Sequence, residues 1–171
     1  MMSKKKLEVQ KILNGDISIP YKDRIQKVEE YLISIADDKT VFGNGKEIIY
    51  PSVFKYKHSF ADGVYIREMK IQQGVLLTGA IHKYKEVFFL LKGKLNIMTE
   101  SGVEEYIAPC YVITPSGSKK MGYAVEESFV VTVHANPTNT QDIKKIEDSM
   151  VAYNWKEYDE FLKKKKHEKN K

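Results

Sequence analysis

The sequence predicts a mainly β protein, a single antiparallel barrel or double-sheet jelly roll with flanking N- and C-terminal α-helices. From about Val53 to Ala135 the chain is rich in β-branched and aromatic residues, and turn residues divide it into short runs. Helical periodicity precedes and follows this region. We expect one domain of 171 residues, with 1–52 as a helical segment packing on the barrel, 53–136 as the barrel, and 137–171 as C-terminal helices and a lysine-rich tail.

The N-terminal region predicts two helices. Leu7–Leu13 has a short helical pattern that Gly15 is placed to end. Residues 22–36 carry one apolar stripe on about four turns, formed by Ile25, Val28, Tyr31, Leu32 and Ile35. Because such a stripe must be buried, we expect this helix on the outside of the barrel or across a subunit interface.

The C-terminal region predicts two more helices. Thr140 is placed to cap Gln141–Met150. Asn154, with Glu157 three residues later, is placed to cap Trp155–Leu162.

Eight strands are predicted between these helical regions. The turn glycines Gly93 and Gly102 separate three of them into hairpins. The predicted strands are Val64–Ile71, Gly74–His82, Val87–Lys92, Lys94–Glu100, Glu104–Ala108, Tyr111–Thr114, Gly122–Val125 and Phe129–His134.

The formal charge of +5 does not by itself predict nucleic-acid binding. Residues 1–6 carry three lysines and residues 163–171 carry six lysines and one glutamate, so the excess positive charge lies in two ends that we expect to be frayed and solvated. With one cysteine, no disulfide forms within the chain, and no apolar run approaches the ~20 residues of a membrane span. We expect a cytoplasmic protein (in the host cytoplasm if viral) that binds neither membranes nor specific nucleic acid.

One motif carries a family resemblance. Gly74, His82, Glu86 and Gly93 have the spacing of the first cupin motif, in which two histidines and a glutamate hold a metal ion, but Ala80 replaces the first histidine. The second cupin motif is matched by the turn 115–117 (Pro-Ser-Gly). Pro109 replaces its leading glycine, Lys120 its histidine and Ala124 its asparagine. The resemblance implies a cupin barrel that has lost half of its metal ligands.

A looser resemblance connects the chain with small cupin-like proteins encoded by bacteriophages. It rests on the runs 60–69 (FADGVYIREM), 78–83 (TGAIHK) and 122–124 (GYA). That group carries no settled function.

Mapping the cupin ligands onto this chain leaves His82 and Glu86 as candidate metal ligands. An ammonium at position 120 repels a divalent cation, unless burial deprotonates it. His58 or His134 remains as an additional donor. We therefore expect no cofactor, with a divalent transition metal as the alternative.

The same positions predict a metal-free pocket. If strand alternation turns His82 and Glu86 inward, the pocket has apolar walls with a few polar anchors. The predicted ligand-binding residues are Tyr65, Arg67, His82, Tyr84, Glu86, Phe88, Lys120 and His134, with Met69 as a further wall residue. Arg67 and Lys120 favour an anionic ligand.

Plainer interpretations stay open for each of these residues. Arg67 lies at the surface if the other face of 64–71 points inward. His82, Glu86 and Lys120 pair with one another if the barrel binds nothing, and Lys119 and Lys120 are solvated if they belong to a loop.

Three functions follow from these patterns. The first is a non-catalytic cupin that binds a small anionic molecule, in one version a phage protein that sequesters a host metabolite or nucleotide signal. The second is a metal-dependent isomerase, decarboxylase or dioxygenase. The third is a phage structural or assembly protein. Barrel edges and the flanking helices predict a homodimer or other homo-oligomer.

Overall fold

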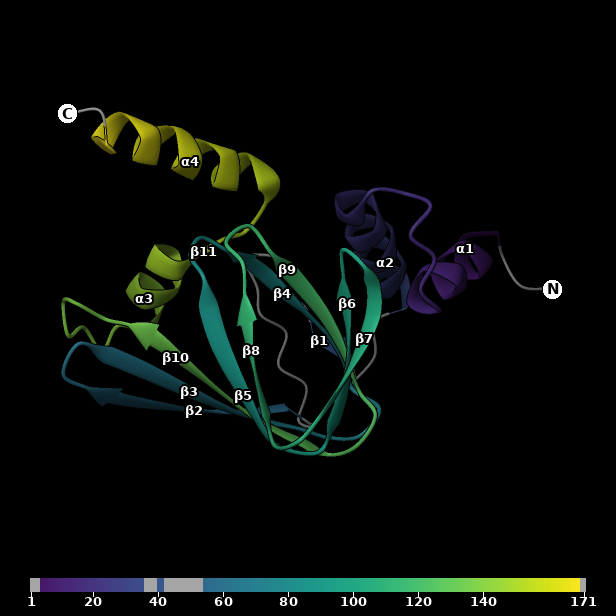
Figure 1. The fold of residues 1–171 in the computed structure, drawn as a ribbon, viewed down its shortest axis with the longest axis horizontal. Helices are drawn as coiled ribbons and strands as arrows, with labels where there is room; N and C mark the ends of the chain where they lie inside the picture. The colour runs from purple at the N-terminus through teal and green to yellow at the C-terminus, as the bar shows by residue number, and fades with distance from the viewer. Residues whose placement is uncertain (1–3, 36–39, 42–53, 170–171) are drawn as a thin grey trace.

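The computed structural model describes residues 4–35, 40–41 and 54–169, which form two facing β-sheets flanked by helices (Figure 1). The first sheet has the order β1 (Thr40–Val41), β4 (Leu76–His82), β9 (Lys119–Ala124), β6 (Lys94–Thr99) and β7 (Gly102–Ile107), with β11 (Val151–Ala152) also on β4. The second has the order β2 (Phe54–Ala61), β3 (Val64–Ile71), β10 (Ser128–Ala135), β5 (Glu86–Lys92) and β8 (Cys110–Thr114).

Strand pairing in both sheets is antiparallel, except that β1 pairs with β4 in parallel. The predicted mainly β class with flanking helices is confirmed, and the two antiparallel layers are consistent with a jelly-roll barrel. The core lies between the sheets because alternate residues of each strand point inward. Its buried members are Ile71, Val75, Phe88, Leu90, Leu95, Ile97, Ala124 and Val130.

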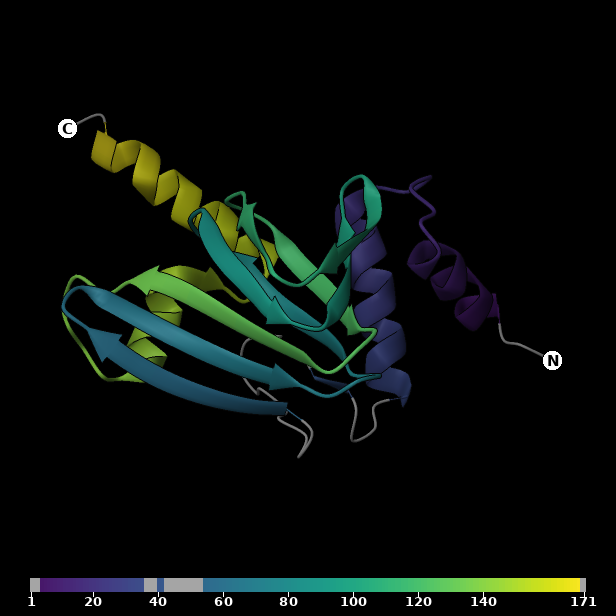
Figure 2. The ribbon, with the colours of Figure 1, turned by 60° about the horizontal axis from the view of Figure 1, so that its bottom comes forward.

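Helix α2 (Tyr21–Ile35) lies against the outer face of the first sheet, and α1 (Lys4–Leu13) lies beside α2 (Figure 2). Their buried residues join side chains from β6 and β9 in one cluster: Val9, Ile12, Ile25, Val28, Leu32, Met98 and Met121. The apolar stripe of α2 is therefore used within the chain. Of the two locations that the sequence leaves open for this helix, the structure shows the outside of the barrel.

Helix α3 (Ile143–Met150) lies at one end of the space between the sheets, and α4 (Trp155–Lys169) extends away from the barrel. Asp142, not Thr140, caps α3, because its side chain accepts a hydrogen bond from the backbone nitrogen of Lys145. The predicted cap of α4 is confirmed: Asn154 Oδ1 accepts from the backbone nitrogen of Glu157 at 3.0 Å.

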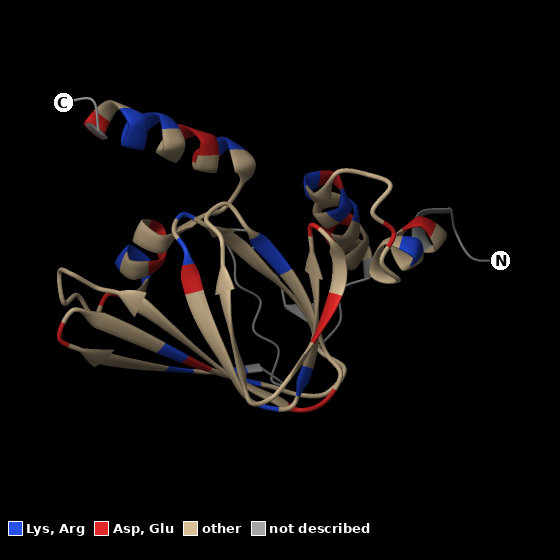
Figure 3. Cartoon of the chain, in the orientation of Figure 1, with Lys and Arg blue, Asp and Glu red and all other residues tan. Residues whose placement is uncertain are grey.

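The expectation of a frayed C-terminal tail is wrong over much of its length. Helix α4 continues through the lysine run to Lys169 (Figure 3). Acidic residues in its first half and lysines in its second half complement the helix dipole, which favours this extension. None of the helices in the described ranges is long and apolar enough to cross a membrane.

All eight predicted strands form, but the two-residue strands β1 and β11 were not predicted, and β2 and β9 also differ from the prediction. Strand β2 was not predicted, although aromatic and lysine residues alternate along its sequence, FKYKHSFA. Strand β9 begins at Lys119, three residues before the predicted Gly122, because Lys119 pairs with Ile81 of β4, and pairing with β6 starts at Met121. Lys119 and Lys120 therefore belong to a strand and not to a solvated loop.

Two motif glycines have positive φ angles, +84° at Gly74 and +86° at Gly93. Only Gly93 is also crowded, because an added Cβ atom would lie 2.2 Å from the carbonyl oxygen of Glu127. The turn between β5 and β6 is therefore packed directly against the start of β10.

Candidate functional site

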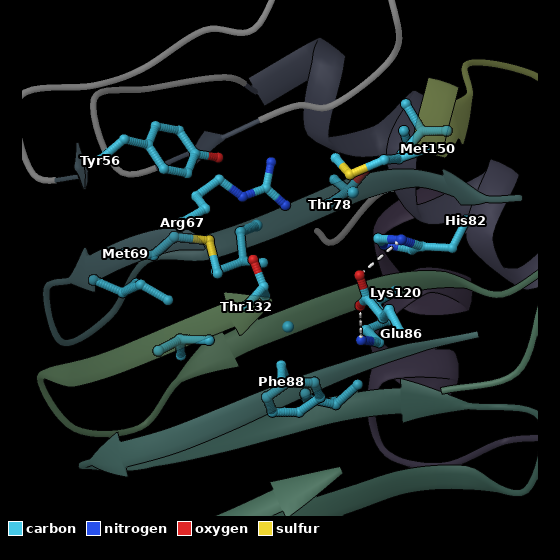
Figure 4. A pocket seen from close by; sticks show the side chains of 18 of the residues that line it. Tyr56, Arg67, Met69, Thr78, His82, Glu86, Phe88, Lys120, Thr132 and Met150 are labelled. Atoms are coloured by element: carbon cyan, nitrogen blue, oxygen red, sulfur yellow. Dashed lines mark hydrogen bonds and ion pairs between the residues drawn. The ribbon is translucent and has the colours of Figure 1, made fainter. Parts of the chain in front are cut away.

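A cavity of about 150 Å³ lies between the two sheets on the side of α3 (Figure 4). Most of its wall is apolar, and the following hydrophobic residues contribute to it: Met69, Ile71, Leu77, Phe88, Leu95, Ile97, Val130, Met150 and Val151. A mainly apolar cavity with a few convergent polar groups is typical of a small-molecule site.

Three polar side chains form one network at the wall of this cavity. The Glu86 carboxylate accepts a hydrogen bond from Lys120 Nζ through Oε1, and its Oε2 lies 2.8 Å from His82 Nδ1. The Lys120 ammonium also lies over the Phe88 ring, 4.3 Å from its centroid. The carboxylate thus faces two nitrogen groups on opposite sides (Figure 4).

Burial and charge pairing shift the pKa values of Glu86 and Lys120 in opposite directions. Burial opposes ionisation of Glu86, but the hydrogen bond and charge of His82 and the charge of Lys120 outweigh it and hold the Glu86 pKa well below its usual range. Burial lowers the pKa of Lys120, and the Glu86 charge partly offsets that effect. Glu86 is therefore a carboxylate at neutral pH, and Lys120 donates a hydrogen bond to it.

Arg67 on β3 supplies a second positive charge to the cavity. Its side chain is 16% exposed, and its NH1 atom lies 3.8 Å from Glu147 Oε1 on α3. Arg67 Nε is buried and has no hydrogen-bond partner among the described residues. The guanidinium is thus paired only loosely. Glu86 accepts a hydrogen bond through Oε1 only, because its Oε2 lies 2.8 Å from His82 Nδ1 without a hydrogen-bond partner among the described residues.

Strand alternation explains why these side chains point inward. On β9, Lys119 and Met121 face α2, whereas Lys120, Gly122 and Ala124 face the other sheet. On β4, the register shifts between Thr78 and Ile81, so the pairing there is irregular. Beyond this irregularity His82 reaches the cavity opposite Glu86.

Five of the eight predicted ligand-binding residues line the cavity: Arg67, His82, Glu86, Phe88 and Lys120. Tyr84 does not, because it lies in the turn between β4 and β5, where alternation is interrupted. It is 51% exposed, with its ring against Phe161 and under Lys165 of α4. The prediction of an inward Tyr84 is wrong.

Tyr65 and His134 face inward but lie behind the cavity wall. Tyr65 is fully buried under α3, and its hydroxyl lies 2.7 Å from His58 Nδ1. His134 stacks on Tyr65, and its Nε2 lies 3.0 Å from Thr132 Oγ1. Burial, followed by the charge of Arg67, lowers the pKa of His134 to about 4. Neither residue belongs to the set that lines the cavity.

The sequence analysis missed several lining residues. Tyr56 comes from the unpredicted strand β2, and its ring lies beside the Arg67 guanidinium at 5.6 Å. Thr132 shares the inner face of β10 with Val130, a position that alternation from His134 indicates. Glu147 comes from α3, and Tyr153 comes from the segment after β11. No local sequence pattern predicts that these segments return to the cavity.

The polar groups of this cavity do not fit the metal centre that the cupin motif implies. No group of three or more His, Cys, Asp or Glu side chains capable of holding a metal ion occurs in the described parts of the chain. His82 and Glu86 are together, but each is engaged with the other, and the Lys120 ammonium occupies the other side of the carboxylate. His58 and His134 point to Tyr65 and Thr132 instead.

A second cavity, of about 320 Å³, lies between the edge strands β7 and β8. It shares Phe88, Ile97 and Lys120 with the first cavity. These three residues thus form part of the wall between the two spaces.

Comparisons with known proteins found similar folds but no relative by sequence. No protein-family model and no curated protein matches the chain. Similar solved structures include a RmlC-like cupin from Shewanella frigidimarina (TM-score 0.44, 8% identity, 54% of this chain and 81% of that chain). They also include KdgF from a Halomonas species (0.45, 11%, 54% and 86%) and an acetylacetone dioxygenase from Acinetobacter johnsonii (0.42, 17%, 51% and 66%).

Proposed function

We propose that the chain is a non-catalytic, cupin-type barrel that binds a small anionic molecule between its sheets, without a metal ion. The observation that carries the proposal is the loosely paired Arg67 guanidinium in the wall of an apolar cavity. A guanidinium stays ionised, and a buried N–H without a partner costs about 1–3 kcal/mol. A carboxylate or a phosphate offers two adjacent oxygen acceptors that can offset this cost.

The remaining charges around the cavity support an anion over a cation. Lys120 and His82 face Glu86 and offset its negative charge, while its Oε2 atom, like Arg67 Nε, has no hydrogen-bond partner among the described residues. Glu147 stands 3.8 Å from Arg67, a distance that leaves the Arg67 donors available to a closer acceptor. Burial raises the pKa of Glu147. Protonation can therefore remove the negative charge of Glu147 more easily when an anion enters the cavity.

The cavity volume limits the part of the ligand that is held inside. About 150 Å³ accommodates a group of benzene size. We therefore place a small organic acid, or the acidic end of a larger molecule, in this space. The resemblance to phage-encoded proteins adds the version in which the chain sequesters a host metabolite, which fits this volume better than a whole nucleotide does.

Calorimetric titration and thermal unfolding with a matched panel test the proposal. We use benzoate, short-chain carboxylates, inorganic phosphate and nucleoside monophosphates, with benzamide as the neutral counterpart of benzoate. We expect stabilisation by at least one anion, since a ligand at 100 times its Kd adds about 2.7 kcal/mol to the free energy of unfolding. Benzamide is expected to give no such shift.

Two variants separate the site from general charge effects. Arg67→Met combined with Glu147→Gln removes the loose pair without leaving either charge alone, and we expect it to abolish anion binding. Lys57→Met removes a lysine that is 70% exposed and paired with Glu68, and it is expected to bind normally. The absence of a shift with every anion, or an undiminished shift in the Arg67 variant, contradicts the proposal.

A further inference from the structure

The second half of α4 carries a run of lysines without acidic partners. Residues 163–166 are four consecutive lysines, which we call the lysine run, and Lys163, Lys164 and Lys166 are exposed. None of the four forms an ion pair within the described ranges of the chain, whereas several lysines of other helices and strands do. The lysine run is therefore an uncompensated positive charge on a regular helix (Figure 3).

Lys165 fixes the orientation of the lysine run relative to the barrel. Its Nζ atom lies 5.0 Å from the ring centroid of Tyr84, in the turn between β4 and β5, and 5.6 Å from that of Phe161. The rings of Tyr84 and Phe161 are themselves in edge-to-face contact, with centroids 5.4 Å apart. The side of α4 that carries Phe161 and Lys165 thus faces the barrel, and the opposite side faces outward.

Helical periodicity distributes the other three lysines over this outward side. Successive residues of an α-helix are about 100° apart around the axis. Lys163 therefore lies about 160° from Lys165, with Lys164 about 100° to one side of it and Lys166 about 60° to the other. The outward side of α4 has lysines along its middle and on both flanks.

The turn between β4 and β5 adds positive charge beside this helix. Lys85 is exposed and forms no ion pair among the described residues, and Lys83 Nζ donates a hydrogen bond to the backbone carbonyl of Asp148 rather than to a carboxylate. Burial lowers the pKa of Lys83; the charges of Asp148 and Glu157 oppose this shift, and the charge of Lys164 adds to it. Two separate segments of the chain therefore bring like charges together at this place.

Acidic residues limit the length of the basic surface. Asp159 and Glu160 lie about one turn before the lysine run, and Glu168 follows it closely. The basic surface of α4 therefore spans about one turn along the helix axis. A contact of this length involves a few charged groups of a partner, which we expect to bind weakly at physiological salt.

We propose that the lysine run binds duplex DNA, with this part of α4 lying in the major groove and its lysines contacting phosphates of both strands. The major groove is about 12 Å wide and admits an α-helix, whose diameter with side chains is about 10–12 Å. Lysines on both flanks of the outward side match the two rows of phosphates that border the groove. Phosphate contacts carry no base information, so we expect binding that is independent of sequence.

Other polyanions fit this arrangement less well. A helix that binds an anionic membrane carries a continuous apolar side, but Leu162 is the one exposed large hydrophobic residue among those described in α4. Double-stranded RNA has a deep, narrow major groove that a helix does not enter. Single-stranded DNA offers no groove with phosphates on both sides. Duplex DNA is therefore the partner that the positions of the lysines favour.

Fluorescence anisotropy of a labelled 20-bp DNA duplex, titrated with the full chain, tests the proposal. We expect a Kd on the order of 10⁻⁴–10⁻⁵ M at physiological salt, within the range of non-specific binding. Three lysine–phosphate contacts predict a slope of about −2.7 for the logarithm of the binding constant against that of the salt concentration. The variant Lys163→Gln, Lys164→Gln, Lys166→Gln is expected to bind at least tenfold more weakly in 0.1 M salt, with a slope near zero.

The matched control removes three lysines from the other end of the molecule. Lys55, Lys57 and Lys70 are exposed on β2 and β3, and their combined replacement by glutamine changes the net charge equally. We expect this control to bind DNA as the wild type does. Circular dichroism shows whether α4 stays helical in the α4 variant, and replacement of the same three lysines by arginine is expected to keep both the helix and DNA binding.

Three comparisons decide the outcome. The labelled duplex is expected to bind more tightly than a 20-nucleotide single strand, a 20-bp RNA duplex or phosphatidylserine vesicles at equal salt. Anion binding in the cavity is expected to stay normal in the α4 variant, because the lysine run does not line the cavity. The absence of duplex binding in 50 mM salt, an equal loss in the β2–β3 control, or equal affinity for RNA, single strand or vesicles overturns the proposal.

Discussion

Two adjacent lysines of β9, Lys119 and Lys120, each bind a glutamate, but on opposite faces of the first sheet. Lys119 points outward and lies 2.7 Å from Glu29 of α2, whose carboxylate also accepts a hydrogen bond from Thr78. Lys120 points into the cavity and binds Glu86. The two sites share their chemical groups and differ in what surrounds them.

The Lys119–Glu29 pair connects α2 to the first sheet, whereas the Lys120–Glu86 pair lies in the wall of the cavity. Glu29 lies on a helix face and is 17% exposed, while Glu86 is only 5% exposed. The same interaction is therefore a helix anchor in one place and part of a cavity wall in the other. Strand alternation, rather than residue type, decides which role each lysine has.

The largest expected effect comes from removing the Glu86 carboxylate from its network with His82 and Lys120. Glu86→Ala leaves the Lys120 ammonium buried without its carboxylate, so we expect the free energy of unfolding to fall by about 3–5 kcal/mol. Urea unfolding at pH 7 measures this change. A loss below about 1 kcal/mol would show that water reaches Lys120 freely, because exposed pairs contribute no more than that.

The inner face is also expected to respond to pH through His134. Its pKa is about 4 in the folded protein, below the ordinary value of 6.5, so the unfolded chain binds the proton first as the pH falls. The stabilisation is complete above pH 6.5 and is lost progressively towards pH 4. Between pH 7 and pH 5 this loss amounts to about 2 kcal/mol.

Replacement of His134 tests that pH dependence. His134→Asn is expected to flatten the dependence of unfolding free energy on pH between 7 and 5. His167→Asn on the exposed part of α4 is the control and is expected to leave it unchanged. An unaltered slope in His134→Asn would assign the pH dependence to another group.

A smaller effect is expected for the outer pair. Lys119→Met leaves Glu29 with its Thr78 hydrogen bond and partial access to water, so we expect a loss of about 1 kcal/mol. Anion binding should stay at the wild-type level, because Lys119 does not line the cavity. Parallel unfolding and calorimetric titration measure both quantities. Weaker anion binding in this variant would mean that α2 influences the cavity through β9.

The smallest expected effect concerns metal. We expect substoichiometric Fe, Mn, Ni and Zn in protein purified without chelator, with the same content in His82→Ala. Elemental analysis by mass spectrometry measures it. One metal ion per chain that disappears in His82→Ala would support the alternative of a metal-dependent enzyme and end the metal-free interpretation.

The sequence predicted the strands well because turn glycines and alternating residues mark them locally. His82, Glu86 and Lys120 were candidates because of the resemblance to the cupin motifs, and Arg67 and Phe88 were candidates on the condition that one strand face points inward. The prediction failed at Tyr84, where a turn interrupts alternation, and at Glu147, which reaches the cavity through a long return of the chain. The loose Arg67–Glu147 contact depends on three-dimensional distance, which no local pattern encodes.

The crowding at Gly93 has a consequence for substitution tolerance. Gly74 has nothing within 4 Å of its Cβ position, so only its backbone angle restricts a replacement there. A saturation library is expected to accept asparagine at position 74, because asparagine tolerates positive φ, but to return glycine alone at position 93. The two glycines of one motif would thus be retained for different reasons, one for its backbone angle and the other for the space that a side chain would need.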